Sequence, residues 1–269
     1  GYYEKAFSLA ADCYPARVGI ARIYLGMGKY DKVLEYIDPV VKEYGGNGEL
    51  YTLQSEAYLG LGDLRNASLF AERALSIIPD SLHLLVLRAR ILESQGNNEQ
   101  AKKLIAVAER QNWREPGLYL VKARLLVKDG YMDRAAELLS EGAAAYPDNL
   151  PLAEALGRLL LQSGKTAEGK VLLENSISRD PTRTEGLIIL IDNAVAESRW
   201  EDASALLARA LSVEDSVDLW KRGAVIALQI GDNEQALAYG EKLRKAKPDA
   251  AEYWIPSIRA LVSMKRFPE

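Results

Sequence analysis

Few side chains in this sequence are of the types that carry out catalysis or bind metals. His83 is the single histidine and Cys13 the single cysteine, so neither a histidine cluster nor a cysteine-based metal site can form within one chain. Carboxylates are numerous, but none stands in a motif typical of acid–base catalysis. Gly60 and Gly62 follow a helical segment rather than a strand, unlike the glycines of a dinucleotide-binding loop. We therefore expect no active site, no cofactor and no metal.

A series of arginines is more informative. Arg90, Arg124 and Arg158 follow one another at intervals of 34 residues. A guanidinium can bind a carboxylate or a phosphate through two parallel hydrogen bonds. These side chains could therefore hold an acidic ligand if the fold brings them to one face, and the elements that position them decide whether it does.

The same interval organises the whole chain. Anchors of mostly small residues recur every 33 or 34 positions, at Val33, Ala67, Ala101, Ala135, Gly169, Ala203 and Ala236. Prolines keep the same register at Pro79, Pro147, Pro181 and Pro248. Glycines do so at Gly28, Gly62, Gly96, Gly130, Gly164 and Gly231, with Ser198 as the one substitute. A fixed period of this length is typical of stacked helix pairs.

Each unit is predicted to contain a helix A of roughly 13–14 residues, a short turn, and a helix B of similar length. The glycine before each anchor suits the left-handed residue that ends a helix, and the proline ends helix B because it cannot continue the hydrogen-bond ladder. Small residues in helix A are expected to face the anchors in helix B, so that the two backbones approach closely. They are Ala21, Ser55, Ala89, Ala123 and Gly157.

This arrangement resembles the tetratricopeptide repeat. Trp220 and Trp254 stand at the first position of the family's pattern, Leu156 and Gly157 at the second and third, and Tyr24 and Tyr58 at the next. The resemblance implies an all-α, right-handed solenoid in which residues 1–269 form a single domain. About seven full repeats are expected, with a partial helix B at 1–13 and a partial helix A at 251–269. The full repeats are 14–47, 48–81, 82–115, 116–149, 150–183, 184–216 and 217–250.

In this family the residue directly after the small residue of helix A faces the concave groove. We name these positions the helix-A row; they are Arg22, Glu56, Arg90, Arg124, Arg158, Asp192, Val225 and Arg259. The resemblance implies that a partner segment binds along this row and along residues one helical turn away. The predicted partner-binding residues are Arg22, Arg90, Arg124, Arg158, Val86, Leu120 and Lys128.

An alternative is that carboxylates of the same chain neutralise the arginines. Glu154 precedes Arg158 by four residues, a favourable helical pair. Glu93 lies three residues after Arg90, and Glu56 occupies the equivalent position on the neighbouring helix. Arg124 differs, because its neighbours one turn away are Leu120 and Lys128 and its counterparts on both sides are arginines. We favour a binding role for Arg124, whereas both interpretations remain open for the series as a whole.

Composition limits the class of partner. With 34 basic and 38 acidic side chains the net charge is −4, which gives no global field to attract nucleic acid or an anionic membrane. No apolar run approaches the ~18 residues that a membrane-spanning helix needs. We expect a soluble protein that inserts into no membrane, and the sequence does not distinguish the cytoplasm from the periplasm.

Our leading hypothesis is a non-catalytic protein–protein interaction scaffold whose groove binds a partner segment, with acidic segments favoured by the arginines. One alternative is a docking or regulatory arm of a larger enzyme. Another is a scaffold for bacterial envelope assembly, in secretion, pilus formation or polysaccharide export. The incomplete repeats at the two ends also suggest self-association, in which the ends of different copies dock head to tail.

Overall fold

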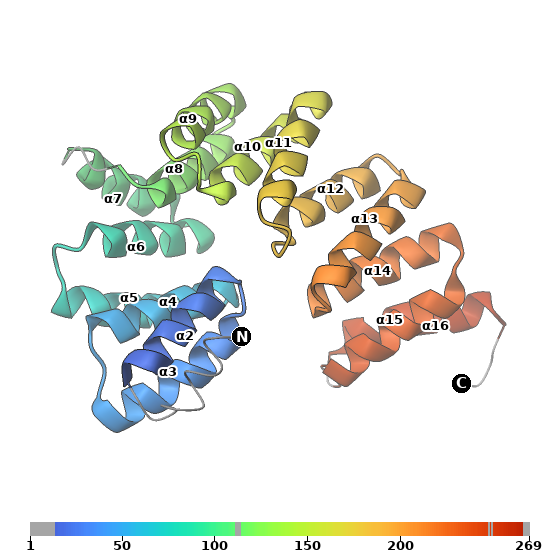
Figure 1. Ribbon diagram of the computed structural model, residues 1–269, viewed down its shortest axis with the longest axis horizontal. Helices are drawn as coiled ribbons and strands as arrows, with labels where there is room; N and C mark the ends of the chain where they lie inside the picture. Colours follow the sequence, from blue (N-terminus) through green and yellow to red (C-terminus); the bar gives the residue numbers. More distant parts are fainter. Residues whose placement is uncertain (1–13, 111–113, 247, 249, 266–269) are drawn as a thin grey trace. The chain divides into compact units, whose positions relative to one another are not determined.

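The fold follows from the 34-residue period. The computed structural model describes residues 14–110, 114–246, 248 and 250–265. These residues form helices α2 to α16 and one 3-10 helix, η1, without a strand among them, so the predicted all-α class is confirmed (Figure 1). They fall into two compact units, residues 1–138 and 139–269, and the boundary lies within α9. The partial helix B predicted at residues 1–13 lies outside the described residues.

Unit 1 is a series of helical hairpins in which each helix A is followed directly by its helix B. Its helices are α2 (Tyr14–Gly26), α3 (Tyr30–Tyr44), α4 (Gly48–Gly60), α5 (Leu64–Ile77), α6 (Leu82–Ser94), α7 (Asn98–Arg110) and α8 (Pro116–Lys128), followed by α9 (Met132–Ala145) at the boundary. Helix α2 packs on α3, α4 on α5 and α6 on α7, while α8 packs on α6 and α7. Successive A helices α2, α4, α6 and α8 also contact one another.

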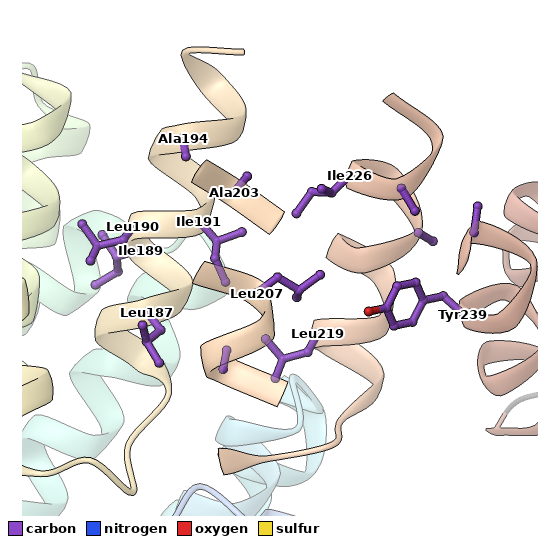
Figure 2. Close-up of a cluster of buried hydrophobic side chains, with 14 of the residues drawn as sticks. Leu187, Ile189, Leu190, Ile191, Ala194, Ala203, Leu207, Leu219, Ile226 and Tyr239 are labelled. Atoms are coloured by element: carbon purple, nitrogen blue, oxygen red, sulfur yellow. The ribbon is translucent and has the colours of Figure 1, made fainter. Parts of the chain in front are cut away.

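Unit 2 repeats this plan. Its helices are α10 (Leu150–Gln162), α11 (Thr166–Arg179), α12 (Glu185–Ala196), α13 (Trp200–Val213), α14 (Val217–Ile230), α15 (Asn233–Ala246), η1 (Ala251–Trp254) and α16 (Ile255–Ser263). One continuous apolar core runs through it. Figure 2 shows Leu187 and Ile191 of α12, Leu207 of α13, Leu219 of α14 and Tyr239 of α15 within this core.

The turn from helix A to helix B is the same hydrogen-bonded motif in every repeat. The turn glycines at 28, 62, 96, 130, 164 and 231 have φ between +70° and +86°, as the left-handed residue after a helix requires. The residue after each one donates its N–H to a carbonyl five positions back, as Asp63 does to Tyr58 at 2.9 Å. Ser198 keeps the motif at a φ of 56°, and Arg199 N donates to Ala194 O at 2.8 Å.

Small residues bring the two helices of a hairpin together, as expected. Ser55 Oγ donates a hydrogen bond of 2.8 Å to the carbonyl of Ala67, which removes the cost of burying a hydroxyl. Gly157 and Gly169 approach still more closely, since a Cβ built on Gly169 would lie 2.8 Å from the Gly157 carbonyl oxygen. Close packing at this point fixes one face of helix A against helix B and leaves the adjoining face available.

The last helix differs from the prediction at its start. One helix A was expected from residue 251, but residues 251–254 form a 3-10 turn and the α-helix begins at Ile255. Pro256 lies in the first turn of α16, where its missing N–H leaves no intrahelical bond unmade. Ile258, at the position where earlier repeats bury a residue such as Ala224 against helix B, is 54% exposed.

Candidate functional site

The helix-A row is positioned by the residue that precedes each of its members. In unit 1 Ala21, Ser55 and Ala89 are completely buried against helix B. The next residue along an α-helix is rotated by about 100°, so its side chain leaves the hairpin interface. Arg22 is accordingly 64% exposed and Arg124 45%, and in unit 2 Arg158 is 50% exposed. The row therefore presents charged side chains on an open face within each unit.

Several members of the row form an ion pair with the residue 27 positions further along the chain. Arg22 Nη2 lies 2.6 Å from Glu49 Oε1. Glu56 Oε1 lies 3.2 Å from His83 Nε2. In unit 2 the Arg158 guanidinium contacts Glu185 in the same way. The second residue always lies in the first turn of the next helix A, so each pair joins two successive repeats.

His83 contacts two carboxylates rather than one. Its Nδ1 lies 3.7 Å from Glu115 Oε2, in addition to the contact between Nε2 and Glu56. The carboxylates of Glu115 and then of Glu56 raise the pKa of His83 to about 10, because both favour the charged imidazolium. At neutral pH the ring is therefore a cation that connects α4, α6 and the start of α8. The sequence analysis assigned no partner to His83; the 27-residue offset from Glu56 is the signal that could have identified one.

Glu93 is the carboxylate that neutralises Arg124. Arg124 Nε donates to Glu93 Oε2 at 2.8 Å, and Lys128 Nζ lies 2.5 Å from Glu93 Oε1. Burial by itself would raise the pKa of Glu93, but Lys128 and Arg124 outweigh burial and lower it. Sequence neighbours one turn away on the same helix gave Arg124 no acidic partner, whereas the structure supplies one from the preceding helix A.

The pairing of Arg158 also differs from the one considered in the sequence. Glu154, four residues before it, is buried and bonds instead to Arg183 Nη2 at 2.9 Å and to Ser176 Oγ at 2.9 Å. Arg158 forms its ion pair with Glu185 instead. A carboxylate within one helical turn was therefore present but turned inward, which helical spacing alone does not reveal.

Arg90 stands apart from the other row members in unit 1. Its side chain is half-buried on α6, and it forms no hydrogen bond or ion pair within the part of the chain that the structure describes. Burial, and then the charge of Arg124, lower the pKa of Arg90. Glu93 and Glu56, the two carboxylates expected near it, are bonded to Arg124 and His83.

The predicted apolar contacts are less accessible. Val86 is only 3% exposed, and its Cγ1 would lie 3.1 Å from a Cβ at Gly117. Leu120 is half-buried. In unit 2 Asp192 is exposed and accepts two hydrogen bonds from Arg222 at 2.7 and 2.9 Å. Val225 is 48% exposed, so the row also offers apolar surface at this point.

Two further observations concern other kinds of site. Among residues 14–110, 114–246, 248 and 250–265, no three His, Cys, Asp or Glu side chains are grouped so as to hold a metal ion. None of the helices formed by these residues combines the length and the apolar character needed to cross a bilayer.

Comparison with known proteins decides the family. Residues 48–81 and 190–251 match family models described as tetratricopeptide repeat. The two segments lie in different units, and the other helix pairs of each unit have the same hairpin arrangement as the matched segment. The chain is a tetratricopeptide repeat (TPR) protein. TPR hairpins form scaffolds for protein–protein interaction, although a fold does not by itself name its ligand.

Relatives of this TPR chain are distant. It is 22% identical over 174 residues to the TPR repeat-containing protein YpiA of Bacillus subtilis. The aligned region covers 64% of this chain but only 41% of YpiA. Among solved structures, a TPR protein from Parabacteroides merdae has a TM-score of 0.60 at 15% identity, over 92% of this chain and 98% of that one. The APC/C hetero-tetramer Cut9–Hcn1 has a TM-score of 0.62 at 13% identity, over 96% of this chain and 51% of that one. Likeness at this level concerns the fold.

Proposed function

We propose that the chain is a non-catalytic scaffold that binds a segment of a partner protein along the helix-A row, and that it prefers acidic segments. The observation that carries this proposal is the open face of successive A helices. Completely buried small residues stand beside exposed charged ones, as Ala21 stands beside Arg22. In the family this face lines the concave groove, and a row of side chains spaced by one repeat suits a ligand that runs along the helices.

The arginines of the row support the preference for acidic segments. Arg124 is 45% exposed although it is bonded to Glu93, and guanidinium groups bind carboxylates in a planar, two-bond geometry. A partner carboxylate would replace water on the exposed side of the group. Ion pairs of exposed side chains contribute little each, so we expect affinity to come from several row positions together.

The test is a panel of fluorescently labelled 15-residue peptides of acidic, neutral and basic composition, measured by fluorescence anisotropy against the whole chain. We expect acidic peptides to bind most tightly, and Arg124→Gln to weaken them several-fold. Lys122→Gln is the matched control, because Lys122 lies on the same helix, is 39% exposed and pairs with Glu109. Equal affinity of wild type and Arg124→Gln for every peptide, or tighter binding of basic peptides, would contradict the proposal.

A further inference from the structure

Within the described part of the chain Arg90 has no ion-pair partner, and the position that supplies one to other row members is a glycine at this repeat. The first turns of α4, α6 and α12 contain Glu49, His83 and Glu185, and each of these pairs with the row residue 27 positions earlier. For Arg90 that position is Gly117, in the first turn of α8. Glycine has no side chain, so the second half of the recurring ion pair is missing at this repeat.

Neighbouring carboxylates offset only part of the missing charge, because burial and Arg124 outweigh the attraction of Glu56 and Glu115 for Arg90. Glu93 lies only three residues after Arg90, but it is buried and already bonds to Arg124 and Lys128. Glu56 and Glu115 both contact His83. A half-buried guanidinium without a partner is unfavourable, since it loses hydration without gaining a hydrogen bond.

The charged side chains around Arg90 have a net charge of +1. His83, Arg90, Arg124 and Lys128 supply four cations, and Glu56, Glu93 and Glu115 supply three carboxylates among the side chains in this group of contacts. A carboxylate carries one negative charge, whereas a phosphoryl group carries about −1.5 to −2 at neutral pH. The single excess positive charge is therefore neutralised by one carboxylate, whereas a phosphoryl group would overcompensate it.

We propose that Arg90 binds one carboxylate of a partner peptide, which occupies the place left by the absent side chain at Gly117. This inference rests on the proposed function and specifies its chemistry at one repeat. The carboxylate belongs either to an Asp or Glu side chain or to the C-terminus of the partner. It completes on α6 and α8 the ion pair that Arg22 and Glu49 form on α2 and α4.

The decisive variant supplies the missing partner from within the chain. Gly117→Glu places a carboxylate at the position of Glu49 and Glu185, and a negative residue is favourable in the first turn of a helix. A Cβ at this position would lie 2.9 Å from Glu115 Oε1 and 3.1 Å from Val86 Cγ1, so Gly117→Gln is the control for the added side chain. We expect Gly117→Glu to weaken the tightest acidic peptide at least fivefold more than Gly117→Gln does.

Arg90 itself is tested with Arg90→Gln and with the control Arg88→Gln, whose residue lies on the same helix near Glu72 at 3.8 Å. We expect the first to reduce affinity for the acidic peptide at least fivefold and the second to leave it unchanged. Replacing each acidic residue of the peptide by its amide, and amidating the C-terminus, identifies which carboxylate loses its effect in Arg90→Gln. A phosphoserine peptide that binds more than tenfold tighter than its Glu counterpart would overturn the match to a single charge.

The outcomes separate this inference from the proposed function. Acidic peptides that bind equally to wild type, Arg90→Gln and Gly117→Glu would overturn the inference and leave the scaffold in place. Failure of every peptide to bind would overturn both. A second readout needs no peptide: Arg90→Met should leave the melting temperature unchanged or raise it, because it removes an unpaired, half-buried charge. A clear drop in melting temperature would show that Arg90 has a structural partner, and would overturn the inference.

Discussion

Arg124 Nε donates a hydrogen bond of 2.8 Å to Glu93 Oε2, across helices of successive repeats and 31 positions apart in the sequence. Glu93 is 6% exposed at a position that is apolar in the other repeats, namely Leu25, Leu59, Val127, Leu161, Val195 and Leu228. A buried carboxylate at this position depends on its two cations, because one that loses its partners is strongly unfavourable. The contact therefore stabilises the stack of α6 on α8.

Glu93→Gln should lower the free energy of unfolding by about 1–2 kcal/mol at pH 7, since hydrogen bonds to charged groups are lost. The pKa of Glu93 is lowered in the folded state, so its contribution is present above the unfolded pKa near 4.5 and disappears as the pH falls through the folded value. Urea unfolding of both proteins at pH 7 and at about pH 3.5 checks this. An equal difference in unfolding free energy between wild type and Glu93→Gln at both pH values would refute this prediction. The control is Glu99→Gln, because the Glu99 side chain is 81% exposed.

Much of the backbone could be predicted from the sequence because the same residue types recur at equivalent positions in successive repeats. The glycines at 28, 62 and 96 and the small residues Ser55 and Gly157 each occupy a place where the structure needs a left-handed residue or a close approach. Every repeat supports the assignment of the others, so a single exception such as Ser198 does not obscure the period.

Ion pairs were harder to predict, because charged side chains reach between repeats. Spacing of three or four residues identifies neighbours on one helix, yet Arg22 pairs with Glu49 at 27 positions and Arg124 with Glu93 at 31. These offsets equal one repeat shifted by one or two helical turns. Their values depend on how successive A helices are displaced along their axes, and a repeat period alone does not fix that displacement.

His83 should titrate far above the usual value for histidine. Glu115 and Glu56 raise its pKa to about 10, and as the single histidine it gives one Hε1 resonance in the proton NMR spectrum. The resonance should show no titration step near pH 6.5, and Glu115→Gln should shift the midpoint down. A wild-type midpoint near 6.5 would mean that the two carboxylates do not hold the imidazolium.

The His83 imidazole also makes the stability of the fold depend on pH between about 6.5 and 10. A raised folded-state pKa stabilises the fold fully below the unfolded value near 6.5, and this stabilisation is lost as the pH rises through about 10. His83→Gln should therefore be less stable than wild type at pH 6, and the two proteins should converge towards pH 10. Thermal unfolding followed by circular dichroism measures the difference; a gap that widens with pH would have the wrong sign.

Ser198→Gly should stabilise the protein by about 1 kcal/mol, because a side chain at positive φ costs roughly 1–2 kcal/mol and glycine offsets part of the gain through its greater freedom when unfolded. Ser198 has a φ of 56° where six other repeats have glycine. The reciprocal change, Gly164→Ser at a φ of 79°, should destabilise by a similar amount. Chemical denaturation of both variants tests the pair, and a change of the same sign in both would exclude backbone strain as the cause.

Gly169→Ala should destabilise unit 2 although alanine is the better helix former. The added Cβ would lie 2.8 Å from the carbonyl oxygen of Gly157 and 3.0 Å from Leu161 Cγ. Overpacking of this kind costs about 1–3 kcal/mol, which exceeds the gain of up to about 1 kcal/mol in helix propensity. Gly19→Ala is the matched control on α2, where a Cβ meets no atom within 4 Å, and it should be neutral or stabilising by about 0.5–1 kcal/mol. If thermal unfolding ranked the two variants in the opposite order, close approach at Gly157 would not be what sets the packing of α10 on α11.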